Sequence, residues 1–257
     1  MFRWLQSSLI IAGLAFVSAG AQAFPLRSPQ VPFNFAPLQG YLNLVDSGIN
    51  VATDQLDAQL WSVAITGNTD FTLMLRTPIA QGYSVGVYNG INPRDAWPPA
   101  STPPPRETFQ VFPPGAVPGW FATLHFGDGD LIVTMFDEKS VLQGQTVYSG
   151  VHPNSFGFYT QSAWSSCWSG HNWFSQDILN GDGIIVNFPQ VLFYASNDLP
   201  GDYWVCFEAC RYEGGPSPFD PGASVSTFDG VVINVQSMRP SPTSKPTWGQ
   251  VKDRYRK

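Results

Sequence analysis

The sequence predicts an all-β fold, namely an antiparallel β-sandwich or a jelly-roll-like domain. Short runs rich in β-branched and aromatic residues follow one another from residue 40 onward, and turn-forming residues separate them. Gly67-Asn68 and Pro200-Gly201-Asp202 are two such turns, since these residue types adopt turn conformations readily. Convincing helical periodicity is absent before the C-terminal tail. Many short strands at this spacing are typical of a sandwich or a barrel.

The first 23 residues predict a secretory signal peptide. Arg3 precedes an apolar run over residues 9–17, and Ala21-Gln22-Ala23 supplies the small residues that a signal peptidase requires. The apolar run is too short to span a bilayer. We therefore expect cleavage after Ala23, a secreted protein (extracellular or periplasmic), and no membrane span after cleavage.

Residues 24–238 are expected to form a single β-sandwich domain, which begins with an extended arm over residues 24–37. The expected strands alternate apolar and polar residues or form short apolar runs. They cover residues 40–45, 60–65, 70–76, 83–88, 120–126, 130–136, 155–159, 183–188, 190–195, 203–207 and 230–235.

Two segments depart from the strand pattern. Residues 93–118 contain nine prolines, so we expect a long Pro-rich surface loop, because proline cannot donate to a central sheet ladder. Residues 239–257 begin with a linker-like composition and end in a tail. In the tail, we expect Trp248, Val251 and Tyr255 to share one face of a short C-terminal helix, and the tail is either a docking segment or a frayed terminus.

The composition excludes two classes of protein. Charged residues make up 12% and aromatic residues 14% of the chain, so it is not intrinsically disordered. The net charge is −6, and lysine and arginine gather only at residues 252–257, so the electrostatic footprint of a nucleic-acid-binding protein is missing.

Three cysteines lie in the exported part, at positions 167, 206 and 210. An oxidising compartment favours one disulfide and one remaining thiol. Cys206 and Cys210 are too far apart to bridge on a straight strand, so we expect Cys167 to pair with Cys210 or with Cys206. The alternative is three reduced thiols that are buried as small apolar groups. The absence of a C-x-x-C pattern argues against a zinc site.

The chain contains an internal echo, because Ser84-Val-Gly-Val-Tyr88 and Ser155-Phe-Gly-Phe-Tyr159 share one pattern. Together with Val51-Ala-Thr-Asp-Gln-Leu-Asp-Ala-Gln-Leu-Trp61 and Trp173-Phe-Ser-Gln-Asp-Ile-Leu-Asn180, these motifs resemble a family of exported bacterial proteins. That family carries a C-terminal domain of unknown function and is often sorted by a PEP-type C-terminal signal. The resemblance extends over residues 50–235 and implies export and a β-rich fold.

The same resemblance implies an acidic box, which in the family has been suspected of binding calcium or of catalysis. Its two segments correspond here to residues 207–209 and 225–232, where only Glu208 and Asp229 retain a carboxylate. Asp177 could join them in a composite calcium site, since calcium needs several converging oxygens. The alternative is that all three are solvated loop carboxylates. The sorting helix of the family is missing from this chain.

A second candidate site is an aromatic, Gly/Ser-rich stretch. It contains Trp164, Trp168, His171 and Trp173, whose rings and polar groups could stack against sugar faces. The alternative is that these bulky rings close one end of the sandwich core.

No strong catalytic signature occurs in the sequence, whether G-x-S-x-G, H-E-x-x-H, G-x-G-x-x-G or a P-loop. We therefore expect a secreted, non-enzymatic structural or adhesive module at or beyond the cell surface. Its partner would be an extracellular glycan or another surface protein. We expect no cofactor other than the calcium ion of the composite site. The alternatives are a lectin-like carbohydrate-binding module, with or without calcium, and then a hydrolase of unknown type.

Overall fold

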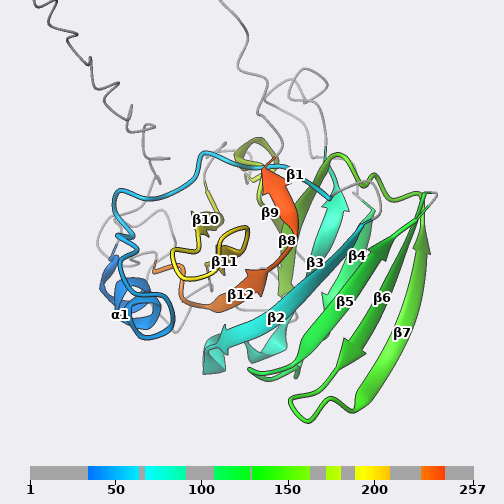
Figure 1. The fold of residues 1–257 in the computed structure, drawn as a ribbon, viewed down its shortest axis with the longest axis horizontal. Coiled ribbons are helices and arrows are strands. Elements are labelled where there is room, and N and C mark those ends of the chain that lie inside the picture. The colour runs from blue at the N-terminus through cyan, green and yellow to red at the C-terminus, as the bar shows by residue number, and fades with distance from the viewer. Residues whose placement is uncertain are drawn as a thin grey trace, which may run out of the picture.

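The fold was analysed in a computed structural model, which describes residues 34–63, 67–90, 107–127, 129–162, 172–180, 189–208 and 227–240. These residues form thirteen strands in two antiparallel sheets, together with one α-helix and two short 3₁₀ helices (Figure 1). The prediction of an all-β sandwich is therefore confirmed. The predicted signal peptide, the strand over residues 183–188 and the C-terminal helix lie outside the described residues.

The larger sheet has seven strands. The strand that comes last among them in the sequence, β12 (Val231–Val235), is not at an edge but is third in the sheet. The order of the sheet is β10 (Val191–Ala195), β11 (Tyr203–Phe207), β12, β2 (Asn68–Arg76), β5 (Phe121–Phe126), β6 (Asp130–Phe136) and β7 (Leu142–Ser149). All neighbours are antiparallel.

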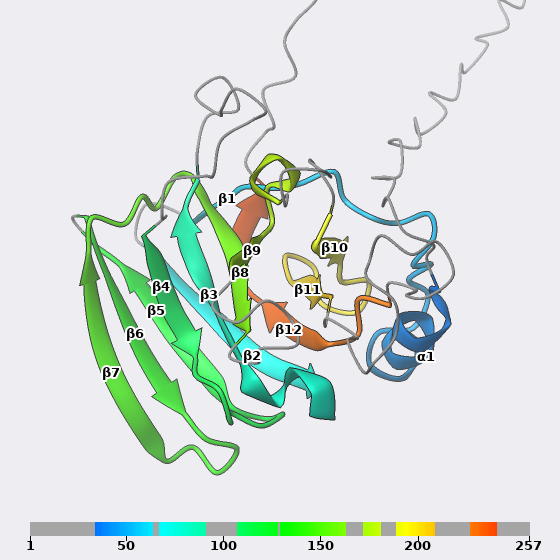
Figure 2. The same cartoon turned by 180° about the vertical axis from the view of Figure 1, so that it is seen from behind.

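The smaller sheet has six strands. Its path is β13 (Met238–Pro240), β1 (Trp61–Val63), β8 (Phe156–Ser162), β3 (Tyr83–Asn89) and β4 (Thr108–Phe112), and β9 (Asn172–Phe174) also pairs with β8. Two 3₁₀ helices, η1 (Pro78–Gly82) and η3 (Asp177–Leu179), precede β3 and follow β9. Figure 2 shows β3, β4 and β8 from the side opposite to that of Figure 1.

The predicted strand over residues 40–45 is wrong, because this segment belongs to the α-helix α1 (Ala36–Val45). Pro37 lies in the first turn, where its missing N–H costs no intrahelical hydrogen bond. Leu38 and Leu42, one turn apart, are both fully buried. The i, i+4 spacing of these leucines was the helical signal in this segment.

The Pro-rich stretch is also not a loop throughout, since β4 lies inside it. Residues 108–112 contain no proline, so every residue of β4 has a backbone N–H for pairing with β3. β4 lies at the edge of its sheet and Pro113 follows it directly, in keeping with the rule that proline is excluded from central strands. Residues 91–106 are outside the described residues.

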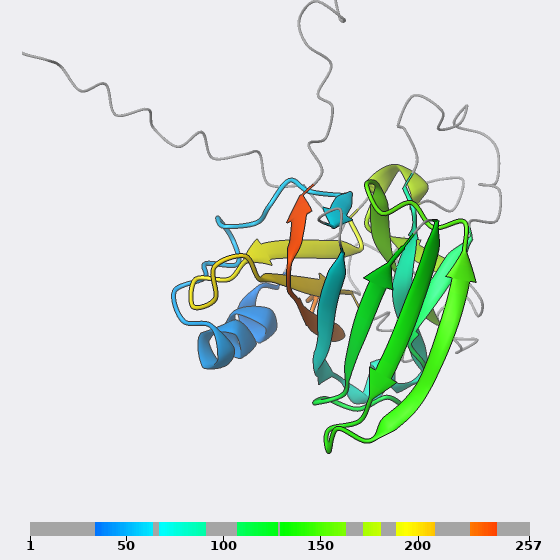
Figure 3. The ribbon, with the colours of Figure 1, turned by 45° about the vertical axis from the view of Figure 1, so that its right-hand side comes forward.

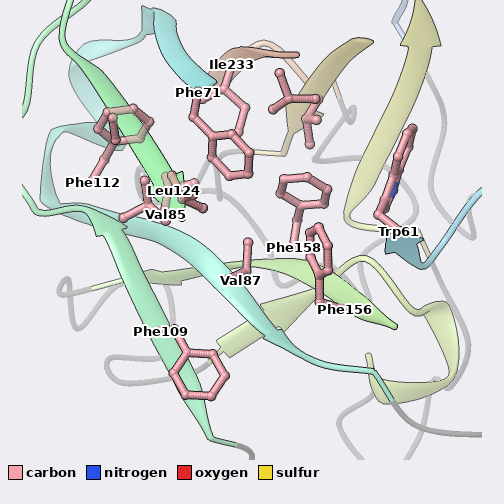
Figure 4. Packing of buried hydrophobic residues seen from close by; sticks show 14 of the residues in the cluster. Trp61, Phe71, Val85, Val87, Phe109, Phe112, Leu124, Phe156, Phe158 and Ile233 are labelled. Carbon is pink, nitrogen blue, oxygen red and sulfur yellow. The ribbon is translucent and has the colours of Figure 1, made fainter. Parts of the chain in front are cut away.

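The main core fills the space between the two sheets, and aromatic rings dominate it (Figure 4). Trp61 is fully buried and packs at 5.0 Å from Phe193 and 4.8 Å from Tyr203, measured between ring centroids. Phe158 of the smaller sheet lies 5.6 Å from both Phe71 and Phe193 of the larger sheet. Burying such rings removes large apolar areas from water, which is the main force that holds the two sheets together.

A second core lies on the other face of the larger sheet, where α1 packs against β10, β11 and β12 (Figures 1 and 2). Leu38 and Leu42 contribute the helix side, and Trp204 is one of the buried residues on the strand side. The end of the helix is fixed by Asp46, whose buried carboxylate accepts hydrogen bonds from Trp204 Nε1 at 2.7 Å and from the backbone N of Asn197.

The two echo motifs lie on neighbouring strands and complement each other. β3 and β8 pair so that Gly86 faces Tyr159 and Tyr88 faces Gly157. A Cβ atom on Gly86 would lie 2.7 Å from the Tyr159 ring, and one on Gly157 would lie 2.5 Å from the Tyr88 ring. Each glycine therefore makes room for the tyrosine of the other motif, and burial raises the pKa of Tyr159 to about 12.

The segment formed by β9 and η3 covers these tyrosine rings. Phe174 and Leu179 pack with Tyr88 and Tyr159 in a third buried cluster. The Tyr88 hydroxyl donates to Gln176 Oε1 at 3.2 Å, and Ser175 Oγ donates to the backbone carbonyl of Gln59 at 2.7 Å. Because these polar groups are paired, the buried side chains cost little desolvation energy.

Candidate binding face

β2, β5, β6 and β7 carry one face that neither α1 nor the β9–η3 segment covers. Along β5, Ala122 and Leu124 are fully buried and point into the main core, whereas Phe121, Thr123 and His125 point to the other side. This alternation follows from the two-residue period of a strand. In Figure 3, β5, β6 and β7 turn this face towards the viewer, and no described element lies across it.

We call this surface the open face, and the strand register arranges it in three rows that cross the sheet. The rows are Asn68, His125, Ile132 and Val147; Asp70, Thr123, Thr134 and Gln145; and Thr72, Phe121, Phe136 and Leu142.

The second row carries polar groups that pair across neighbouring strands. Thr123 Oγ1 donates to Asp70 Oδ1 at 2.7 Å, and Gln145 Nε2 donates to Thr134 Oγ1 at 3.0 Å. These bonds hold the side chains in defined positions. They use one atom of each terminal group, so Asp70 Oδ2 and Gln145 Oε1 remain available to a ligand.

The first row adds an imidazole and the third row adds an apolar patch. His125 Nδ1 lies 2.7 Å from Asn68 Oδ1, and both residues are exposed. Phe121 and Phe136 stack with ring centroids 4.9 Å apart and remain half-buried. The open face therefore places an apolar ring pair beside hydrogen-bonding groups that are neutral except for Asp70.

The charge of the open face is low. Asp70 is the one carboxylate among these twelve residues, and none of them is a lysine or an arginine. Asp130, which is exposed at the start of β6 on the same side as Ile132, adds a second carboxylate beside the first row. Such a surface does not attract phosphates or polyanions. Its chemistry fits a ligand with many neutral hydroxyl or amide groups and some apolar surface.

The sequence contained a signal for this face. In residues 121–126, Thr123 and His125 stand two residues apart between apolar residues, and in residues 130–136 Asp130 and Thr134 share one side of the strand, which indicates strands with one solvated side. The rows themselves were not readable, because they require the register of strands that are far apart in the sequence, such as that of Asp70 with Thr123.

Two of the three predicted calcium ligands lie close together. Glu208, just after β11, accepts hydrogen bonds through Oε2 from the backbone N–H groups of Thr227 and Phe228 at 2.8 and 2.9 Å. Asp229 accepts a hydrogen bond from the Thr227 hydroxyl. Phe228 has a positive φ of 51°, so the carboxylate of Glu208 holds a strained turn that leads into β12.

Asp177 lies elsewhere, in η3, where its backbone N–H donates to Gln59 Oε1 at 3.0 Å. Among the residues that the structure describes, no three His, Cys, Asp or Glu side chains form a group that could hold a metal ion. The calcium site therefore stays a prediction, and the observed contacts of Glu208 are those of a carboxylate that stabilises a turn.

Of the predicted aromatic site, the structure describes Trp173 alone. Trp173 is half-buried in β9 and faces Thr160 of β8. Trp164, Trp168 and His171 lie outside the described residues, so the grouping of these rings stays a prediction.

Of the three cysteines, the structure describes Cys206 alone. Cys206 has a free thiol and is fully buried in the second core, beneath α1. Burial raises the pKa of this thiol well above its ordinary value, so it stays protonated. Cys167 and Cys210 lie outside the described residues, and their disulfide stays a prediction.

Comparison of the chain with protein-family models and with curated proteins gave no match. The helices within the described residues include none that is both long and apolar enough to cross a membrane.

Proposed function

We propose that this chain is an exported, non-enzymatic adhesive module that contacts its partner through the open face. The observation that carries this proposal is the half of the larger sheet that has no described cover. There, Asp70, Gln145, His125 and the Phe121–Phe136 pair are presented on a rigid sheet. Binding residues fixed on strands lose little conformational entropy when a partner docks.

A neutral glycan is the partner class that this chemistry favours. Sugars present hydroxyl groups and apolar C–H faces, and the open face offers hydrogen-bonding atoms beside an aromatic pair without any cation. This is the lectin-like alternative, moved from the aromatic stretch around Trp173 to the open face. A surface protein with a polar, weakly charged patch is the other partner class.

The test is binding to an array of neutral and acidic glycans, followed by titration of the best ligand. We expect wild type to bind neutral glycans, and the Asp70→Ala/Gln145→Ala variant to bind at least about tenfold more weakly, which is about 1.4 kcal/mol. The matched control is Asp198→Ala, which removes one exposed carboxylate from the turn between β10 and β11. If the open-face variant binds as tightly as wild type, this face is not the contact surface.

Export has its own test. Secreted material should begin at Phe24, and N-terminal sequencing or intact-mass measurement reads this directly. Protein that retains residues 1–23 outside the cytoplasm would contradict the proposed export signal.

A further inference from the structure

β7 forms one outer edge of the larger sheet, on the side farthest from α1 (Figure 1). It is eight residues long, and most of its side chains are exposed. No described segment pairs with its outer side. A strand in this position presents a row of backbone N–H and C=O groups, which can template pairing with another strand.

The other edges of the two sheets are protected. Beside β10, Gln55 forms a bridge with Tyr194, and the N–H of Leu56 donates to the carbonyl of Phe193 at 2.8 Å. The outer edge of β4 is contacted by the Tyr148 hydroxyl, which donates to the carbonyl of Gln110 at 3.0 Å.

The two remaining edges belong to β9 and β13. The side chain of Asn180 pairs with both the N–H and the carbonyl of Phe174, so it occupies the place of a neighbouring strand beside β9. β13 has only three residues and ends at Pro240. Short strands, proline and covering groups are the usual devices that prevent edge-to-edge pairing.

β7 has none of these devices. Residues 142–149 include no proline and no charged residue. Of the six large apolar side chains that are exposed in the described residues, three belong to β7 or directly precede it: Val141 (54%), Leu142 (58%) and Val147 (58%). A long, uncharged edge with exposed apolar side chains is suited to association with another strand.

We propose that β7 pairs antiparallel with β7 of a second copy of this chain, so that two seven-stranded sheets join into one continuous sheet. A two-fold axis brings a strand antiparallel to itself, and the absence of charges in β7 means that no like charges meet at that axis. Because β7 is the one unprotected edge among the described strands, the assembly closes as a dimer and does not grow into a fibre.

The test is sedimentation equilibrium of the full chain between about 1 and about 500 µM, since an interface of two short strands is expected to be weak. Wild type should pass from monomer to dimer within this range. The variant Gln145→Lys/Val147→Lys places like charges across the two-fold axis, and its dimer should be at least about tenfold weaker. Both substituted side chains are exposed, so the melting temperature should stay close to that of wild type.

The matched control is Leu44→Lys, the same kind of change at a side chain of α1 that is 85% exposed. It should dimerise like wild type. A second measurement is hydrogen exchange of the β7 amides, which should slow at high concentration in wild type and in the control but not in the lysine variant. A wild type that remains monomeric, a lysine variant that dimerises normally, or species that keep growing beyond the dimer would each overturn the proposal.

Discussion

The two halves of the larger sheet are built from different kinds of strand. In β10, β11 and β12 nearly every residue is buried, because the main core covers one face and α1 covers the other. In β5 and β6 the buried residues alternate with half-buried or exposed ones, and β7 is mostly exposed. One sheet therefore combines a half that is buried on both faces with a half whose outer face has no described cover.

The difference between the halves is set by residues outside the sheet. α1 supplies Leu38 and Leu42 to one half, and the described chain supplies no equivalent to the other. The first of four predictions tests this comparison directly, and the other three test burial and turn contacts elsewhere in the fold.

The largest effect on stability is expected where α1 packs against the larger sheet. Leu42→Ala should lower the free energy of unfolding by about 2–5 kcal/mol, because it leaves a cavity between α1 and β10–β12. Leu44→Ala on the same helix, at an 85% exposed position, should change it by less than about 0.5 kcal/mol. Urea unfolding measures both. A small loss for Leu42→Ala would show that α1 is not needed for the stability of the covered half.

The second effect appears at alkaline pH. Burial raises the pKa of Tyr159 from 10.0 to about 12. The contribution of the protonated Tyr159 hydroxyl to the free energy of unfolding is therefore fully present below pH 10, and it is lost as the pH rises through about 12. The difference between a pKa of 10.0 in the unfolded chain and about 12 in the folded protein corresponds to a loss of up to about 2.7 kcal/mol in the free energy of unfolding. We expect Tyr159→Phe to lose less stability than wild type between pH 10 and pH 12, as measured by urea unfolding at several pH values.

The same comparison controls for other groups that titrate in this range. Burial raises the pKa of Tyr41 to about 12 and lowers that of Arg76 to about 10, and both groups are present in wild type and in the variant. Their contributions cancel in the difference between the two proteins. Identical pH profiles for the two proteins would refute the assigned role of Tyr159.

The third effect compares two glycines in strands. A Cβ on Gly86 would lie 2.2 Å from the carbonyl oxygen of Phe109, whereas one on Gly144 in β7 would meet nothing within 4 Å. Gly86→Ala should therefore cost about 1–3 kcal/mol, and Gly144→Ala should be neutral or slightly stabilising. Thermal melting distinguishes the two. Equal effects would mean that the buried strand β3 and the exposed strand β7 accommodate an added methyl group equally well at these positions.

The smallest effect concerns Glu208. Glu208→Gln should cost about 1 kcal/mol, because a neutral acceptor replaces the carboxylate that binds the N–H groups of Thr227 and Phe228. The loss should be the same with millimolar calcium and with excess chelator. A melting temperature that rises with calcium in wild type but not in Glu208→Gln would instead establish the metal site.

The sequence was informative where burial imposes a pattern on the strands. Residues 130–136 and 203–207 were predicted as strands with the observed bounds, because both are runs of β-branched, aromatic and leucine residues bounded by turn signals. β7 was not predicted, because both of its faces are largely solvated and Gln143, Gly144 and Gln145 hide any apolar period. α1 was misread as a strand because its Leu, Tyr and Val content also suits one.

The candidate site was less accessible to sequence reasoning. The open face depends on which residues of β2, β5, β6 and β7 stand opposite one another, and register is set by the assembled sheet. The proximity of Glu208 and Asp229 was anticipated through the family resemblance. The use of Glu208 to hold the turn at Phe228 was not, because a positive φ at a phenylalanine leaves no mark in the sequence.

The position of β12 has a consequence for the order of folding. β12 is the next-to-last of the described strands, yet it lies between β11 and β2 and joins them. Until residues 231–235 are available, β2–β5–β6–β7 and β10–β11 are two separate sheets, each with an unpaired inner edge. A chain emerging from the ribosome therefore cannot complete its larger sheet until residues 231–235 have appeared. Truncation before residue 231 should leave a chain whose two sheets are not joined, and it should aggregate through their exposed edges instead of forming a slightly smaller domain.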